Sequence, residues 1–162
     1  MWVTALADTH VRRGRNQRLP EPVYDTLARS DAVLHAGDVL SRELLAELAS
    51  FAPVYAVLGN NDHELIGVLP ETRRVTLAGV DIALVHDPGA RAGRAARLNR
   101  RFPDAAVVVF GHTHEPCAQM GVGGQLLFNP GSPTQRRRQP FHTFGELELR
   151  DGRVVSHRIV RV

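Results

Sequence analysis

Short apolar runs alternate with amphipathic segments along the first two thirds of the chain. This alternation predicts strands and helices that take turns, as in an α/β protein. Among the amphipathic segments, Pro22 suits the first turn of one helix and Ser41 can cap another. Helices are expected at 21–29, 41–50 and about 90–102, and strands at 2–7, 32–36, 54–58, 80–85 and 105–110.

The pattern changes after residue 124, where apolar stretches are separated by turn residues. Residues 124–128 run into the sequence Asn129-Pro130-Gly131-Ser132. Further on, Arg150-Asp151-Gly152 separates two apolar stretches, and Asp-Gly accepts the positive φ angles of a tight hairpin turn. We therefore expect the last third of the chain to be antiparallel.

The chain has 162 residues, of which 43% are apolar and 23% charged, as is usual for one globular domain. We find no repeat, low-complexity run or internal boundary, so we expect a single domain over residues 1–162. The N-terminal apolar run is short, has no basic segment before it and ends at Asp8, which argues against a signal peptide and against a membrane span. Cys117 is the only cysteine, which excludes an internal disulfide and agrees with the cytoplasmic location that we expect.

All 20 basic residues are arginines, and the formal net charge is +3. Arginine keeps its charge at any relevant pH and binds phosphate or carboxylate through two parallel hydrogen bonds. A bias in genome composition would produce the same arginine content. The charge therefore suits an anionic partner without specifying one.

Polar residues follow each of the apolar runs. In open α/β sheets the carboxyl ends of the strands form one edge, and ligands bind there. We therefore expect these polar groups to converge on one crevice. They are Asp8-Thr9-His10, Gly37-Asp38, Gly59-Asn60-Asn61-Asp62, His86-Asp87, Gly111-His112-Thr113-His114 and Asn129-Pro130-Gly131-Ser132.

Each of these groups alone has an ordinary structural explanation, because an Asp or Asn after a strand commonly forms a turn. Taken together, two aspartates, one asparagine and four histidines from these groups would give about seven donors, all of them oxygen or nitrogen. Seven donors are too many for one tetrahedral zinc ion and suit two metal ions that share a carboxylate.

The ordered motifs Asp-x-His, Gly-Asp, Gly-Asn-x-Asp, His and Gly-His-x-His resemble those of the calcineurin-like metallophosphoesterase superfamily. The short chain and the Asn-Pro-Gly-Ser turn are similar to the small bacterial and archaeal phosphodiesterase branch related to the retromer scaffold subunit. The resemblance implies an α/β fold of two packed, mostly mixed β-sheets flanked by helices, a four-layer sandwich.

The resemblance also implies the metal ligands and the reaction. One metal ion would be held by Asp8, His10 and His114, the other by Asn60, His86 and His112, and Asp38 would bridge them. Two divalent ions lower the pKa of a shared water, and the hydroxide would attack the phosphorus of a small phosphodiester or nucleotide. We expect manganese, although iron, nickel, cobalt and zinc also suit these ligands.

Two other functions remain open. Relatives in the retromer use this fold as a protein-binding scaffold without turnover. The arginine content also fits a nuclease or RNA-processing enzyme, which is less favoured because the chain lacks the length for a separate domain to read a long nucleic acid.

The sequence departs from the family pattern after the metal-binding asparagine. Many relatives carry a histidine there that is thought to assist the leaving group, whereas this chain has Asn61. His63 is a candidate substitute, although it is also the kind of histidine found in exposed loops. Arginine runs follow Asp8-Thr9-His10 and Asn129-Pro130-Gly131-Ser132, and such runs are usually only solvated surface. For substrate contact the candidates are Arg12, Arg13 and Arg136.

Overall fold

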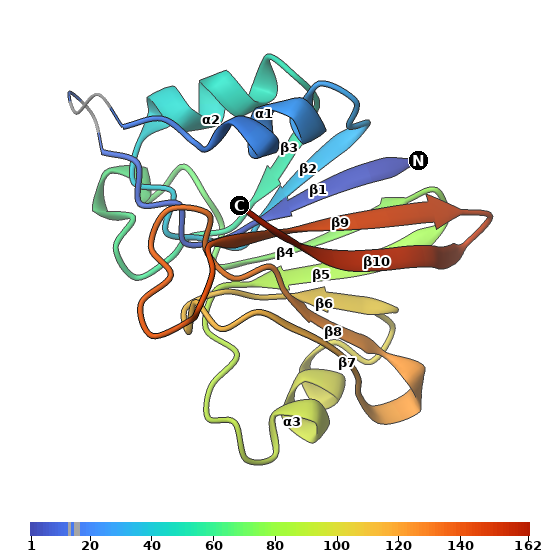
Figure 1. The fold of residues 1–162 in the computed structure, drawn as a ribbon. Helices are drawn as coiled ribbons and strands as arrows, with labels where there is room; N and C mark the ends of the chain where they lie inside the picture. Colours follow the sequence, from blue (N-terminus) through green and yellow to red (C-terminus); the bar gives the residue numbers. More distant parts are fainter. Residues whose placement is uncertain (13, 15–16) are drawn as a thin grey trace.

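The structure is a computed structural model that describes residues 1–12, 14 and 17–162, and it consists of two five-stranded sheets packed face to face (Figure 1). In the first sheet three parallel strands are extended at one edge by an antiparallel hairpin. Its strand order is β10 (Arg153–Arg161), β9 (Thr143–Arg150), β1 (Trp2–Leu6), β2 (Ala32–His35) and β3 (Val54–Ala56).

The second sheet is also mixed. Its three inner strands are parallel, and each edge strand is antiparallel to its neighbour. The strand order is β4 (Thr72–Leu77), β5 (Val80–Val85), β6 (Val107–Val109), β8 (Leu126–Asn129) and β7 (Cys117–Met120).

Helices cover the outer faces of both sheets. Helices α1 (Glu21–Leu27) and α2 (Arg42–Ala49) lie on the first sheet, and α3 (Arg94–Arg101) lies on the second (Figure 1). Three buried apolar clusters separate the layers: one between the sheets, one beneath α1 and α2, and one beneath α3. The predicted four-layer α/β sandwich is thereby confirmed.

Local sequence signals account for two of the helix starts. Pro22 stands in the first turn of α1, and the Ser41 hydroxyl accepts a hydrogen bond from Leu44 N at 3.3 Å. The third helix begins at residue 94, later than expected from the apolar pattern, because Gly93 before it has a φ of 67°. The Arg97 guanidinium donates to the carbonyl of Pro88 at 3.0 Å and so helps to hold the irregular segment before α3.

The expectation of an antiparallel last third was partly wrong. The hairpin of β9 and β10 is present, with Asp151 and Gly152 at φ angles of 49° and 74°. However, β8 pairs in parallel with β6. The strands β4 and β7 were not predicted, because their mostly exposed or half-buried side chains give edge strands no apolar run.

The helices of the described residues are all too short or too polar to span a membrane. Arg13, one of the expected substrate contacts, lies outside the described residues.

Candidate metal centre

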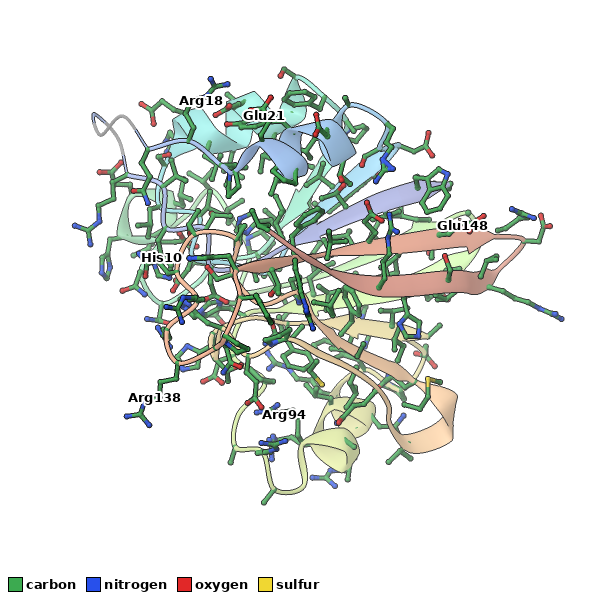
Figure 2. The ribbon with its side chains drawn as sticks, viewed as in Figure 1. His10, Arg18, Glu21, Arg94, Arg138 and Glu148 are labelled. Atoms are coloured by element: carbon green, nitrogen blue, oxygen red, sulfur yellow. The ribbon has the colours of Figure 1, made fainter. Side chains whose placement is uncertain are left out.

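The seven predicted ligand residues stand at or just beyond the carboxyl ends of five strands. Asp8 and His10 follow β1, Asp38 follows β2, and Asn60 follows β3, whereas the second sheet supplies His86 after β5 and both His112 and His114 after β6. In Figure 2, His10 lies at the end of the sheets where loops from both sheets meet. The structure thus brings residues up to 106 positions apart in the chain into one cluster.

One half of the cluster is formed by Asp8, His10 and His114, all of them buried, with possible ligand atoms within 4.8 Å of one another. The Nε2 atom of His114 lies 3.3 Å from Oδ1 of Asp8 and 3.3 Å from Nε2 of His10. The family resemblance implies that these three residues hold one metal ion.

The other half is centred on Asn60. Its amide Oδ1 lies 3.0 Å from Nε2 of His86 and 3.0 Å from Nδ1 of His112. Asp38 lies between the halves, since its Oδ2 is 3.5 Å from Nε2 of His10 and 3.6 Å from Nε2 of His86. A carboxylate that bridged two ions would need such a position.

The hydrogen bonds of the histidines fit this cluster to cations. Backbone carbonyls only accept, so His86 donates through Nδ1 to Ala36 O at 2.7 Å, and His114 donates through Nδ1 to Gln135 O. A neutral ring that donates through Nδ1 presents a lone pair at Nε2. In the neutral rings these lone pairs face other acceptors, Asn60 Oδ1 and Asp8 Oδ1, and a cation between them would relieve that repulsion.

Asp8 supplies a second observation of the same kind. Its Oδ2 atom is buried and has no hydrogen-bond partner. A buried carboxylate oxygen without a partner is costly, and carboxylate with imidazole is a donor set that divalent transition metals accept. The residues present therefore fit metal ions.

The backbone at the cluster is unusual. Five of the seven residues have positive φ angles: Asp8 at 53°, His10 at 45°, Asp38 at 57°, His112 at 67° and His114 at 57°. Such angles are uncommon outside glycine and cost of order 1–3 kcal/mol each, so the surrounding structure must enforce them.

Two kinds of contact enforce this backbone. Hydrogen bonds join the loops, with Asp8 N donating to Gly37 O at 2.9 Å and His10 N donating to Asp38 O at 2.9 Å. The loops after β2 and β3 also approach each other closely, because a Cβ at Gly59 would lie 2.2 Å from Asp38 N. Glycine is therefore required at that position.

Sequence reasoning missed the role of Asp62, which it treated only as part of a motif. This buried carboxylate accepts hydrogen bonds from three backbone N–H groups: Asp38 at 2.9 Å, Gly59 at 2.7 Å and Leu40 at 2.8 Å. Asp62 thus ties the loop after β2 to the loop after β3. The tendency of an Asp after a strand to accept hydrogen bonds from nearby backbone N–H groups is the signal that would have revealed this role.

Asn61 contacts Asp38 twice. Its backbone N donates to Oδ1 at 2.9 Å, and its side-chain Nδ2 donates to Oδ2 at 2.7 Å. Burial alone would raise the pKa of the Asp38 carboxyl, but these hydrogen bonds, with His86 and His10 nearby, hold that pKa below its ordinary value. Asp38 is therefore kept as a carboxylate.

Burial keeps the nearby imidazoles neutral. It lowers the pKa of His10 and outweighs the opposing effect of Asp38 and Asp8, while His114 and Arg137 lower it further. Burial also lowers the pKa of His35 to about 3. His35 is completely buried beneath the cluster, with Nε2 at 3.0 Å from the Thr9 hydroxyl, so it supports the loop after β1 from below.

A cleft of about 430 Å³ opens beside the cluster, and a shallower hollow of about 280 Å³ adjoins Asn60 and His86 on another side. Four of the predicted site residues line the larger cleft: the metal-ligand candidate His10, the catalytic candidates Asn61 and His63, and the substrate-contact candidate Arg12. Among the residues that the structure describes, the larger cleft is lined by His10, Arg12, Leu40, Asn61, His63 and Glu64.

Two arginines after the Asn-Pro-Gly-Ser turn make different contacts. Arg136, which the sequence singled out, donates to Gln139 O at 2.7 Å within its own loop. Its neighbour Arg137 donates through Nη1 to the carbonyl of His112 at 3.0 Å and so reaches the cluster. No feature of the sequence distinguishes these two neighbours.

This fold and this cluster define a metallophosphoesterase class. Residues 1–152 match the model of the calcineurin-like phosphoesterase superfamily domain, and the chain belongs to that superfamily. Vps29 structures superpose over the full length of the chain, which places it in the small branch related to Vps29.

Two archaeal proteins described as probable metallophosphoesterases are similar to this chain. That of Methanothermobacter thermautotrophicus is 33% identical over 139 residues, which cover 85% of this chain and 80% of the relative. That of Methanocaldococcus jannaschii is 32% identical over 159 residues, covering 93% and 77% respectively. Among solved structures, Entamoeba histolytica Vps29 in complex with Zn²⁺ superposes with a TM-score of 0.78 and 26% identity over 100% of this chain and 98% of that one.

Proposed function

We propose that the protein is a metal-dependent phosphodiesterase that hydrolyses a small phosphodiester or nucleotide. One observation carries the proposal: seven residues with oxygen or nitrogen ligand atoms, including the partnerless Oδ2 of Asp8, form one connected cluster. We assign Asp8, His10 and His114 to one ion, Asn60, His86 and His112 to a second, and Asp38 to both. Bound divalent ions would neutralise phosphate oxygens and lower the pKa of water at the site.

The residues of the chain prepare the site for such ions. The low pKa of Asp38 keeps it anionic, and the lowered pKa of His10 leaves an imidazole that can act as a ligand. The bonds from Nδ1 of His86 and His114 to carbonyls fix the orientation of both rings. None of these groups needs to reorganise when substrate arrives, which favours electrostatic stabilisation of charge on the phosphate.

Within the part of the chain that the structure describes, the site has no evident general acid to protonate the leaving oxygen. Asn61 carries an amide, which is not an acid, and its side chain is already bonded to Asp38. His63 lines the larger cleft, and we propose it as the donor. Without an efficient donor, aryl leaving groups should react well and alkoxides poorly, since general acid catalysis contributes about 10²- to 10⁴-fold.

The experiment is hydrolysis of bis(p-nitrophenyl) phosphate by purified protein loaded with Mn²⁺. We expect turnover that a chelator abolishes and that Asp38→Ala and His112→Ala reduce by at least about 10²-fold. His157→Ala, which removes an exposed histidine on β10, is the matched control and should retain activity. His63→Gln should impair a dialkyl phosphate more than the aryl diester.

The metal loading must be measured in the same samples. Protein that binds two equivalents of metal and yet hydrolyses no aryl phosphodiester would exclude the enzymatic proposal. Manganese is our proposal for the metal, and a parallel loading with iron, nickel, cobalt and zinc tests it. The cytoplasmic location and the single domain over residues 1–162 stay predictions.

The likeness to Vps29 favours a second candidate, a protein-binding scaffold of the same fold, because it extends over the whole chain. A stoichiometric protein partner that co-purifies with the chain, together with an absence of turnover, would support this alternative. The cleft of about 430 Å³ suits a small ligand better than a long nucleic acid.

A further inference from the structure

The loop from Ser132 to Arg137 is attached to two of the five ligand-bearing turns of the centre, those after β1 and β6. The Ser132 hydroxyl donates to Asp8 O at 2.7 Å, and the Thr134 hydroxyl donates to Thr9 O at 2.6 Å. From the other sheet, His114 donates through Nδ1 to Gln135 O. This 132–137 loop is therefore positioned by the same turns that hold the candidate metal ligands.

Arg137 ends this loop and reaches back over the centre. Its Nη1 donates to the carbonyl of His112 at 3.0 Å. His112 stands in the turn after β6 that also carries His114, and we assign these two histidines to different ions. The guanidinium is thus held at a turn that serves both halves of the centre, and the backbone of Arg137 has a φ of 51°.

Most N–H groups of the Arg137 guanidinium are not used in its contact with His112. It has five N–H groups, of which one is used at His112. Within residues 1–12, 14 and 17–162, no carboxylate forms an ion pair with it. A solvent-exposed cation fixed at one N–H can receive an anion through the others at little cost in side-chain entropy.

We propose that Arg137 is a substrate-binding residue whose guanidinium donates hydrogen bonds to non-bridging oxygens of the phosphate at the metal centre. The role of Arg137 in turnover rests on the proposed function, whereas its binding of phosphate does not depend on turnover. The planar guanidinium matches a phosphate with two parallel hydrogen bonds, which are stronger than bonds between neutral groups.

The two neighbouring arginines provide the contrast. The Arg136 side chain donates to Gln139 O, a carbonyl three residues along the same segment, and so makes a local contact. Arg138 extends away from the molecule into solvent, as Figure 2 shows. Arg138 has the same charge and chemistry one position further along, so it is the matched control for a contact specific to Arg137.

The test compares Arg137→Ala, Arg137→Lys and Arg138→Ala as Mn²⁺-loaded proteins. The first measurement is the affinity for inorganic phosphate by isothermal titration calorimetry, and the second is kcat/KM for the aryl phosphodiester. We expect Arg137→Ala to weaken both by roughly 10- to 100-fold, as for a lost charged hydrogen bond. Arg137→Lys should recover part of the loss, and Arg138→Ala should stay within about twofold of the wild type.

Metal content and phosphate binding separate the possible outcomes. The proposal fails if metal-loaded wild type binds no phosphate, if Arg137→Ala binds it as tightly as wild type, or if Arg138→Ala loses as much. It also fails if Arg137→Ala loses metal, because the residue would then act through the turn at His112. Phosphate binding that depends on Arg137 without any turnover would support this inference and reject the proposed function.

Discussion

Asp38 depends on two neighbours, one for its backbone and one for its carboxylate. Asp62 accepts a hydrogen bond from Asp38 N, and Asn61 donates two to the Asp38 carboxylate. Since Asp38 has a positive φ of 57°, its conformation is not one that it would adopt unaided. These two neighbours therefore position the carboxylate that we assign to both metal ions.

At this scale we predict that Asp62→Asn weakens metal binding. The neutral amide has only one acceptor oxygen for the three N–H groups that Asp62 now satisfies. We expect a loss of about 1–3 kcal/mol in the free energy of unfolding and roughly 10- to 100-fold in metal affinity. Urea unfolding and metal titration measure the two effects.

Asp25→Asn is the control, because Asp25 is an exposed carboxylate on α1. It should change neither quantity appreciably. Unaltered metal affinity in Asp62→Asn would show that the three hydrogen bonds do not position the centre.

Among the elements, β9 is joined to α1 and β10 through one buried carboxylate. Glu146 on β9 is 3% exposed, and it accepts hydrogen bonds from Thr26, Arg29 and Arg158. Burial alone would raise the pKa of Glu146, but the bonds and charges of Arg158 and Arg29 outweigh it and hold the pKa below its ordinary value of 4.5. The carboxylate therefore stabilises the folded state in its ionised form.

We predict that Glu146→Gln lowers the free energy of unfolding by about 1–3 kcal/mol at neutral pH. A carboxyl whose pKa is lower in the folded state contributes stability above its unfolded pKa, and this contribution is lost as pH falls through the folded pKa. The difference between variant and wild type should accordingly shrink below about pH 4.5. Urea unfolding of both proteins at a series of pH values between about 3 and 8 measures this difference.

Glu148, two residues along the same strand, gives the comparison. It pairs with Arg150, whose side chain is 65% exposed, so Glu148→Gln should cost no more than about 1 kcal/mol. A Glu146→Gln effect that stays constant down to acid pH would contradict the assignment of its stabilising effect to the ionised form.

The stability of the whole molecule depends on how closely the two sheets pack against each other. Gly145 on β9 faces Phe128 on β8 of the other sheet, and a Cβ at Gly145 would lie 2.4 Å from the nearest ring atom. Phe128 is fully buried between the sheets. The ring therefore occupies space that a side chain at position 145 would take.

We predict that Gly145→Ala destabilises the protein by about 1–3 kcal/mol through this overlap. Phe128→Leu should also lower the free energy of unfolding on its own. The double variant should lose less than the sum of the two single losses, because the smaller side chain at position 128 makes room for a Cβ at position 145. Urea unfolding of the four proteins measures the coupling. Fully additive losses would mean that the strain at Gly145 lies elsewhere.

The predictability of the structure from sequence differs between its parts. Inner strands such as β6 are continuous apolar runs, so their positions were predicted. The edge strands β4 and β7 were missed because exposed strands need no apolar pattern. The parallel pairing of β8 with β6 was missed as well, since pairing direction depends on residues remote in the chain.

Local patterns of residues were enough to predict the kinds of ligand atom and the strand ends at which they stand, because an apolar run that stops at polar residues has local causes. The packing of the two sheets was needed to show that Asp38 lies between His10 and His86, that Asp62 ties two loops together, and that Arg137 rather than Arg138 turns toward the centre. These contacts join the ends of strands in two different sheets, so they depend on how the sheets pack, which no local pattern of residues specifies.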